Sequence, residues 1–187
     1  MSDRAEAVIQ LHGRTDIDIL LARYLTMHEA PPDGGSAGSV NMKRLYGHPA
    51  DLRVVVRAMA GTVPSSTQAI GAADVGSMPL ATALAWTLEL PAVYVRDTPG
   101  AMLSYGDMPA PDGTSLIGER LVPETIVHVV DDMITSGETA ARALSIYRGA
   151  GLVVDEMTAV LGGASEARLV QLAESLSLTI LHILVRQ

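Results

Sequence analysis

The sequence predicts an α/β protein with a doubly wound, mainly parallel sheet flanked by helices. Five short apolar runs rich in β-branched residues each end in turn or polar residues, and segments with helical spacing separate most of them. Strands that alternate with long helices indicate βαβ units and a parallel sheet. The runs IVHVV and TAVLGG are continuously apolar, which is typical of strands buried on both faces.

The expected elements follow one another along the chain. A helix at Pro49–Met59 precedes the first strand. The strands are expected at Gln68–Ala73, Ala92–Arg96, Ile126–Asp131, Val154–Leu161 and Leu178–Val185. The helices between them are expected at Met78–Leu90, Glu138–Gly149 and Ser165–Leu176.

Two segments do not follow this alternation. Residues 1–48 contain an amphipathic stretch, Asp16–Tyr24, and a Gly/Pro/Ser-rich loop, so we expect a small N-terminal hood on the 49–187 core of a single domain. The connection Asp97–Glu119 has neither a helical nor a strand period. A structureless loop of this length is typical of a mobile active-site lid or of disorder.

Composition narrows the class of protein. The 48% hydrophobic content of the 187 residues is mainly aliphatic and supplies a core, and the absence of Cys excludes disulfides, thiolate catalysis and Cys-based zinc sites. A net charge of −8 disfavours nucleic-acid binding. The N-terminus lacks an apolar signal region and no run reaches spanning length, so we expect a cytoplasmic protein that does not contact a membrane.

One strand end carries a candidate ligand site. Ligands of open parallel sheets bind beyond the carboxyl ends of the strands, and the run Ile126–Val130 leads there to Asp131 and Asp132. The chain then turns through Thr135–Thr139 into a helix, which gathers backbone amides, hydroxyls and a helix N-terminus as a phosphate requires. Carboxylates accept from hydroxyls, so ribose 5-phosphate would satisfy both halves. The alternative is a structural turn in which Asp and Thr act as caps.

The segment VHVVDDMITSGET resembles the phosphoribosyl pyrophosphate motif of type I phosphoribosyltransferases. The resemblance implies that Asp131 and Asp132 hold the ribose hydroxyls and have the catalytic role. It also implies that the 5′-phosphate is cradled by Thr135, Ser136, Gly137, Glu138 and Thr139. A P-loop, GxxxxGK[ST], is not found.

A wider resemblance leads to the orotate phosphoribosyltransferase branch of that family. Gly71, Gly76, Pro79, Leu80 and Ala81 stand where that branch has its pyrophosphate loop and the following helix. The resemblance implies pyrophosphate contacts from Asp74, Val75, Gly76, Ser77 and Arg96. In the hood-like LTMH and SVNMKRLYGHPADLR, His28 is a candidate base contact and Lys43 a candidate anion ligand, although a surface position explains either residue as well.

The chain departs from that branch in its long loop. Orotate enzymes carry lysines there that meet the departing pyrophosphate, whereas VRDTPGAMLSYGD has none and places Asp97 at the first lysine position. Fixed positive charge stabilises a dianionic leaving group, so we expect slow orotate turnover. His128, within an apolar strand, is expected to be a core histidine, and Asp107 and Asp112 are expected to be solvated.

The resemblance implies transfer of ribose 5-phosphate to a nitrogenous base, with orotate as the first candidate, which is a step of pyrimidine biosynthesis. It also implies that the protein is a homodimer. Mg²⁺ is expected to arrive mainly through the pyrophosphate of the substrate, with no direct metal ligand from the protein. Two alternatives stay open: a nucleotide-sensing protein that keeps the site without catalysis, and a phosphoribosyltransferase for another base.

Overall fold

The computed structural model describes residues 8–27, 38–96, 108–109 and 115–186, and within these ranges an eight-stranded sheet forms the centre. Its order is β1-β10-β9-β8-β4-β5-β7-β6, with a separate pair β2-β3. Neighbours from β1 to β5 are parallel, while β7 and β6 continue the sheet in antiparallel orientation. The strands are β1 (Val8–Leu11), β2 (Leu25–Met27), β3 (Gly38–Val40), β4 (Ala69–Ala72), β5 (Ala92–Arg96), β6 (Met108–Pro109), β7 (Ser115–Gly118), β8 (Val127–Ile134), β9 (Glu156–Gly162) and β10 (Ile180–Arg186).

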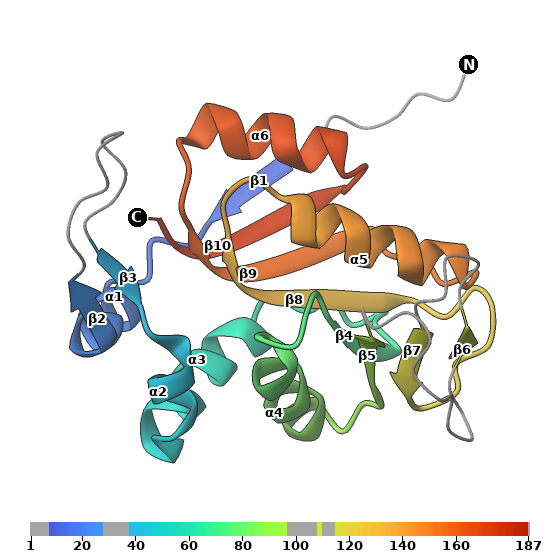
Figure 1. Cartoon of the computed structure of the whole chain (residues 1–187), viewed down its shortest axis with the longest axis horizontal. Coiled ribbons are helices and arrows are strands. Elements are labelled where there is room, and N and C mark those ends of the chain that lie inside the picture. Colours follow the sequence, from blue (N-terminus) through green and yellow to red (C-terminus); the bar gives the residue numbers. More distant parts are fainter. Residues whose placement is uncertain (1–7, 28–37, 97–107, 110–114, 187) are drawn as a thin grey trace.

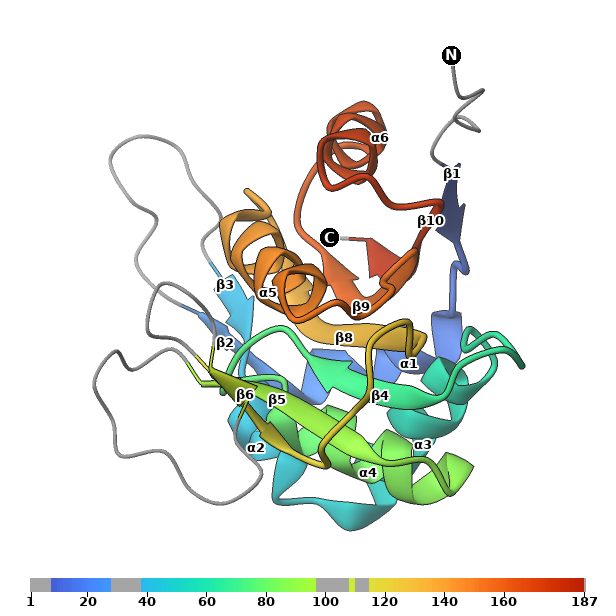
Figure 2. The ribbon, with the colours of Figure 1, turned by 90° about the vertical axis from the view of Figure 1, so that its right-hand side faces the viewer.

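Helices cover both faces of the sheet, which confirms the doubly wound prediction (Figures 1 and 2). Helices α5 and α6 lie on one face, and α1, α2, α3 and α4 lie on the other. The described helices are α1 (Thr15–Leu21), the 3-10 turn η1 (Ala22–Tyr24), α2 (Met42–Tyr46), α3 (Pro49–Ala60), α4 (Met78–Leu88), α5 (Glu138–Gly149) and α6 (Glu166–Ser175). None of them is long and apolar enough to cross a membrane.

Strand β8 continues three residues beyond its expected end at Asp131. Its partner β4 ends at Ala72, but pairing with β9 goes on through Met133↔Leu161 and Ile134↔Gly162. In the sequence, two adjacent Asp residues after an apolar run indicate the end of a strand. Pairing with β9 continues because it needs only the backbone groups of these residues. Asp131 and Asp132 therefore lie within the strand, beside the point where β4 stops.

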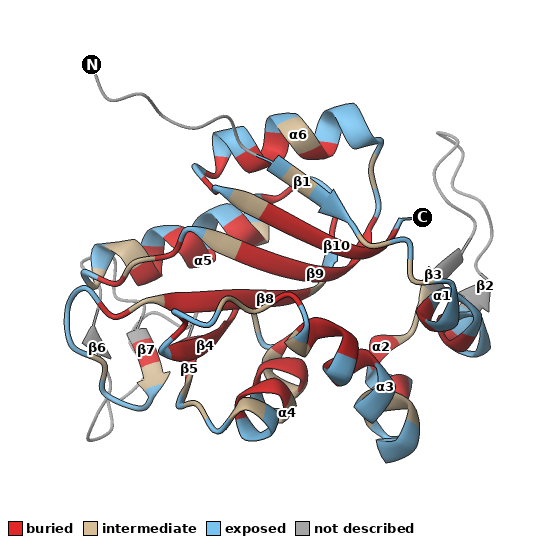
Figure 3. Cartoon of the chain, turned by 180° about the vertical axis from the view of Figure 1, so that it is seen from behind, coloured by how far each residue is buried: buried red, intermediate tan, exposed pale blue. Residues whose placement is uncertain are grey.

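The first 48 residues are not only a hood. Strand β1 joins the main sheet in parallel register with β10, Val8↔Ile180 to Leu11↔Ile183. As an edge strand it is largely exposed (Figure 3), so its sequence lacks the continuous apolar run of the central strands. The expected amphipathic stretch at 16–24 forms α1 and η1, and the hairpin β2–β3 leads into α2.

The expectation of a structureless connection over Asp97–Glu119 is wrong for its described part. Strands β6 and β7 pair with each other, and β7 pairs with β5 from Val93↔Gly118 to Arg96↔Ser115. Two strands of two and four residues are too short to show a period in the sequence. Residues 97–107 and 110–114, with Asp107 and Asp112, lie outside the described residues.

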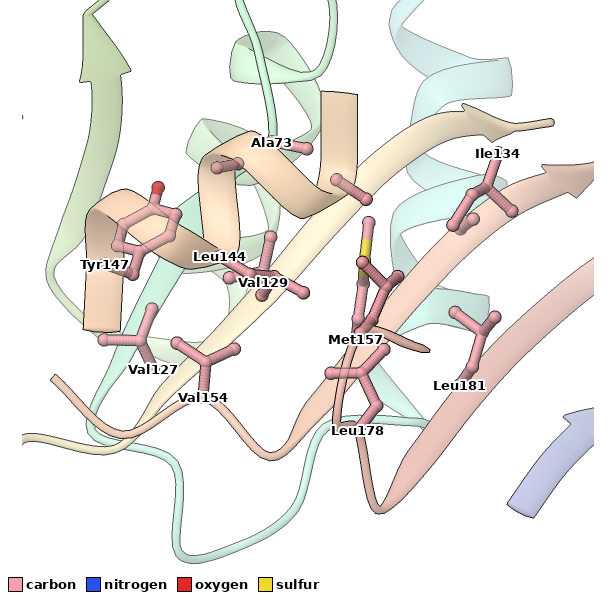
Figure 4. Close-up of a cluster of buried hydrophobic side chains, with 14 of the residues drawn as sticks. Ala73, Val127, Val129, Ile134, Leu144, Tyr147, Val154, Met157, Leu178 and Leu181 are labelled. Carbon is pink, nitrogen blue, oxygen red and sulfur yellow. The ribbon is translucent and has the colours of Figure 1, made fainter. Parts of the chain in front are cut away.

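Helix α5 is joined to the strands next to the candidate site through Tyr147. This residue is completely buried in the hydrophobic cluster of Figure 4. Its hydroxyl donates to the carbonyls of Ala72 at 2.8 Å and Val93 at 3.0 Å. A Cβ on Gly71 would lie only 2.8 Å from the same hydroxyl oxygen, so only glycine fits there. The contact sets the position of α5, and with it the loop before α5, against the end of β4.

Candidate active site at the switch between strands β4 and β8

The candidate site lies where the winding of the sheet changes direction. From β4 the chain passes through α4 to β5, and from β8 it passes through α5 to β9 on the opposite side. Helices α4 and α5 cover opposite faces (Figure 1), so the loops at the carboxyl ends of β4 and β8 diverge. Such a switch point opens a crevice that open α/β sheets use for ligands.

The acid pair, Asp131 and Asp132, lies on β8 at this switch point. Asp131 is 3% exposed and Asp132 is half-buried. The backbone N–H of Asp132 donates to Oδ1 of Asp131 at 2.9 Å, and the N–H of Ala73 donates to the carbonyl of Val130 at 3.0 Å. The sheet thus holds the pair directly beside the start of the β4–α4 loop.

The β4–α4 loop, residues 74–77, is closed by its own hydrogen bonds. The N–H of Asp74 donates to Oγ of Ser77 at 3.0 Å, and the N–H of Ser77 donates to Oδ1 of Asp74 at 2.9 Å. Ser77 is fully buried. These bonds occupy the N–H groups of Asp74 and Ser77, two of the four loop residues expected to contact pyrophosphate. Val75 and Gly76 are therefore the residues in this loop whose N–H groups are candidates to donate to pyrophosphate.

Gly76 lies close to the carboxylate of Asp74 in the same loop and to that of Asp132 on β8. A Cβ at Gly76 would lie 3.1 Å from Oδ1 of Asp74 and 3.5 Å from Oδ2 of Asp132. Asp74, a predicted pyrophosphate contact, therefore also places a third carboxylate near the acid pair.

This convergence of charge dominates the electrostatics of the site. Burial, followed by the charges of Asp132 and Asp74, raises the pKa of Asp131 to about 8. Burial and then the charge of Asp74 also raise the pKa of Asp132. Buried like charges disfavour ionisation of each other, so the site favours ligands that donate hydrogen bonds or bring positive charge.

The β8–α5 turn has the geometry of a phosphate loop. Helix α5 begins at Glu138 after Gly137, whose φ is 82° and whose missing side chain leaves room for Leu172. Thr135, Ser136 and Glu138 are exposed and Thr139 is half-buried. The first amides of a helix lack partners within it, so the N-terminus of this twelve-residue helix presents donors toward the crevice side of the sheet.

Tyr46 is a site residue that the sequence analysis missed. Its hydroxyl donates to Oδ2 of Asp132 at 3.3 Å, from the end of helix α2. Lys43, the candidate anion ligand on the same helix, is exposed. The sequence carries little signal for Tyr46, because a tyrosine after a short amphipathic helix is an ordinary packing residue.

The remaining candidates have different outcomes. His128 is a core residue as predicted: Nε2 lies 2.7 Å from Oγ1 of Thr158, and burial lowers its pKa to about 3. The backbone of Arg96 ends β5, next to β4 on the carboxyl edge of the sheet. His28 lies outside the described residues. Within the described ranges, no group of three or more His, Asp or Glu side chains is arranged to hold a metal ion.

No protein-family model matches the chain, but known proteins resemble it in sequence. It is 33% identical over 113 residues to the orotate phosphoribosyltransferase of Methanocella arvoryzae and 32% identical over 101 residues to that of a Nocardioides species. These matches cover 60% and 54% of this chain, and 59% and 51% of the respective relatives. The chain therefore spans about half to three fifths of the length of these relatives.

Solved structures resemble the chain over nearly its whole length. Orotate phosphoribosyltransferase from Aeropyrum pernix has a TM-score of 0.67 at 20% identity, and covers 90% of this chain and 93% of its own. Adenine phosphoribosyltransferase from Thermoanaerobacter pseudethanolicus has a TM-score of 0.68 at 15% identity, with 89% and 98% covered. At these identities the comparison shows the fold alone. The chain thus resembles orotate phosphoribosyltransferases in sequence and has the fold that they share with adenine phosphoribosyltransferases.

Proposed function

We propose that the protein is a phosphoribosyltransferase that transfers ribose 5-phosphate from phosphoribosyl pyrophosphate to a nitrogenous base, with orotate the first candidate. One observation carries the proposal: the pair Asp131–Asp132 and the amides that open α5 flank the same switch-point crevice. The similarity to orotate phosphoribosyltransferases supports this reading. We also propose that the protein acts in nucleotide metabolism in the cytoplasm, with pyrimidine biosynthesis as the first candidate pathway.

In this proposal each part of the crevice has one task. Residues 135–139 bind the 5′-phosphate, and Asp131 and Asp132 accept hydrogen bonds from the ribose hydroxyls. The base nitrogen forms the new bond to the anomeric carbon as the bond to pyrophosphate breaks. The electron pair of the broken bond leaves with pyrophosphate, and the proton of the base nitrogen passes to pyrophosphate or solvent. Positive charge grows on the ribose in between, and the nearby carboxylates stabilise it.

Mg²⁺ is the cofactor that we propose, held mainly by the pyrophosphate of the substrate. The carboxylates of Asp74, Asp131 and Asp132 make the crevice acidic, so pyrophosphate neutralised by Mg²⁺ would approach it more readily than bare pyrophosphate. When bound, Mg²⁺ would neutralise charge on the leaving group. The carboxylates of the chain would orient the hydroxyl groups and repel an unneutralised pyrophosphate.

Two alternatives keep the same site. The absence of lysine from 95–107 favours a nucleotide-sensing protein with weak or no catalysis. The adenine enzymes match the fold as well as the orotate enzymes do, with TM-scores of 0.68 and 0.67, and this leaves room for another base.

A pyrophosphate-release assay with phosphoribosyl pyrophosphate, Mg²⁺ and a panel of bases tests the proposal. We expect the wild type to bind phosphoribosyl pyrophosphate, and Asp131→Asn with Asp132→Asn to weaken that binding by on the order of tenfold or more, because hydrogen bonds to charged groups are lost. Circular dichroism checks that the double variant keeps the fold. Equal affinity of folded wild type and double variant in calorimetry would contradict the site assignment.

We also propose a homodimer, on resemblance to a family whose long loop reaches a neighbouring subunit. A groove of about 950 Å³ between α3 and α4 supports it, since Trp86 beside it is 83% exposed. Arg53, Arg57 and Glu89 line the same groove, so a second copy related by a twofold axis could pair opposite charges across it.

A further inference from the structure

Tyr46 connects the N-terminal segment to the acid pair. It is the last residue of α2, and its hydroxyl donates to Oδ2 of Asp132 across 86 residues of sequence. The same oxygen lies 3.5 Å from the position of a Cβ on Gly76. Oδ2 of Asp132 therefore lies close to both the phenol and the β4–α4 loop.

The phenol is in an acidic environment that keeps it protonated. Burial, followed by the charges of Asp132, Asp74 and Asp131, raises the pKa of Tyr46 far above its ordinary value. It can therefore act as a hydrogen-bond donor at every working pH. Its bond also lowers the pKa of Asp132, in opposition to burial and Asp74, which raise it.

We propose that Tyr46 is a positioning residue that holds the carboxylate of Asp132 ionised and oriented to receive a hydroxyl group of the phosphoribosyl ligand. This rests on the proposed function, which makes ribose hydroxyls the partners of Asp132. A carboxylate has about four acceptor positions, and the phenol uses one of them on Oδ2. The backbone of Met133 and the side chain of Asp131 also hydrogen-bond with this carboxylate, so its rotation is restricted and the positions left over are available to the ligand.

A purely structural role for Tyr46 makes a different prediction. If the phenol only attached α2 to the core, loss of its hydroxyl would change stability without changing the titration of Asp132. Tyr24 provides a matched control: its hydroxyl donates to Oδ2 of Asp51 at 2.5 Å, and so links η1 to α3 through the same type of bond. Neither Tyr24 nor Asp51 belongs to the crevice.

The experiment compares wild type, Tyr46→Phe and Tyr24→Phe. Carboxyl ¹³C NMR follows the titration of Asp132 in the ligand-free protein. We expect the pKa of Asp132 to rise by about one unit in Tyr46→Phe, the equivalent of one charge-assisted hydrogen bond, and to stay unchanged in Tyr24→Phe. An unchanged Asp132 titration in folded Tyr46→Phe would overturn the proposal.

Calorimetry with phosphoribosyl pyrophosphate provides the second readout. We expect Tyr46→Phe to bind the ligand more weakly and to recover part of the loss as the pH rises, because a higher pKa moves the ionisation of Asp132 to higher pH. A loss of equal size at every pH, or an equal loss in Tyr24→Phe, would count against positioning. A wild type that binds no phosphoribosyl ligand would overturn the proposed function, whereas the NMR titration would still decide whether Tyr46 controls Asp132.

Discussion

At the scale of single residues, the site places acidic side chains where their ionisation is unfavourable. Asp131 is buried beside two further carboxylates, and its pKa is raised to about 8 by burial, Asp132 and Asp74. An aspartate in an unfolded chain titrates near pH 3.9. The folded protein therefore binds this proton more tightly, and the stability of the ligand-free protein falls as the pH rises from about 4 to about 8.

Asp131→Asn removes this titration. We expect the free energy of unfolding of the ligand-free variant to fall less between pH 5 and pH 8 than that of the wild type, by on the order of 1.4 kcal/mol for each pH unit over which only folded wild-type Asp131 binds a proton. Thermal unfolding followed by circular dichroism measures it. Asp18→Asn, at an exposed position on α1, is the control. An identical pH dependence of stability in wild type and Asp131→Asn would show that the pKa of Asp131 is not raised in the folded protein.

At the scale of elements, the start of α5 depends on one glycine. Gly137 has a φ of 82°, and any side chain there would collide with Leu172. We expect Gly137→Ala to lower the free energy of unfolding by roughly 1–3 kcal/mol and to weaken binding of inorganic phosphate, because the loop must shift. Gly149→Ala, at the open end of the same helix, should instead stabilise it. Chemical denaturation and phosphate calorimetry test both; a Gly137→Ala variant with wild-type values of both would contradict the phosphate-loop geometry.

The connection after β5 is the second element with a testable role. Its sequence lacks the lysines of orotate enzymes, so orotate turnover should be slow while ligand affinity persists. We expect Asp97→Lys with Ala101→Lys to raise kcat more than it changes KM, since each preorganised donor to such a leaving group is worth roughly 2.7–4 kcal/mol. Steady-state kinetics with orotate measure the split, with Asp97→Asn separating loss of negative charge from gain of positive charge. Ordinary turnover by the wild type would refute this reading of the loop.

At the scale of the whole molecule, the α3–α4 groove predicts self-association. We expect sedimentation equilibrium to show a dimer at micromolar concentration, and Trp86→Glu to shift it toward monomer, because a charge would replace the exposed indole beside the groove. Val122→Glu, an exposed apolar position in the loop before β8, should leave the dimer intact. A wild-type monomer at these concentrations would refute the dimer.

The sequence by itself determined the repeated strand–helix unit, the central strands with their helices, and the place of the acid pair. Burial on two faces leaves apolar runs such as those at 126–130 and 158–163, which mark the central strands. It could not determine β1, β6 or β7, since strands of two to four residues show no clear pattern and are stabilised mainly by pairing with a neighbouring strand. Only the tertiary structure decided that β8 runs past Asp131, and that Asp74 and Tyr46 meet Asp132. The physical reason is that residues from three distant segments converge through backbone pairing and packing, which local sequence does not record.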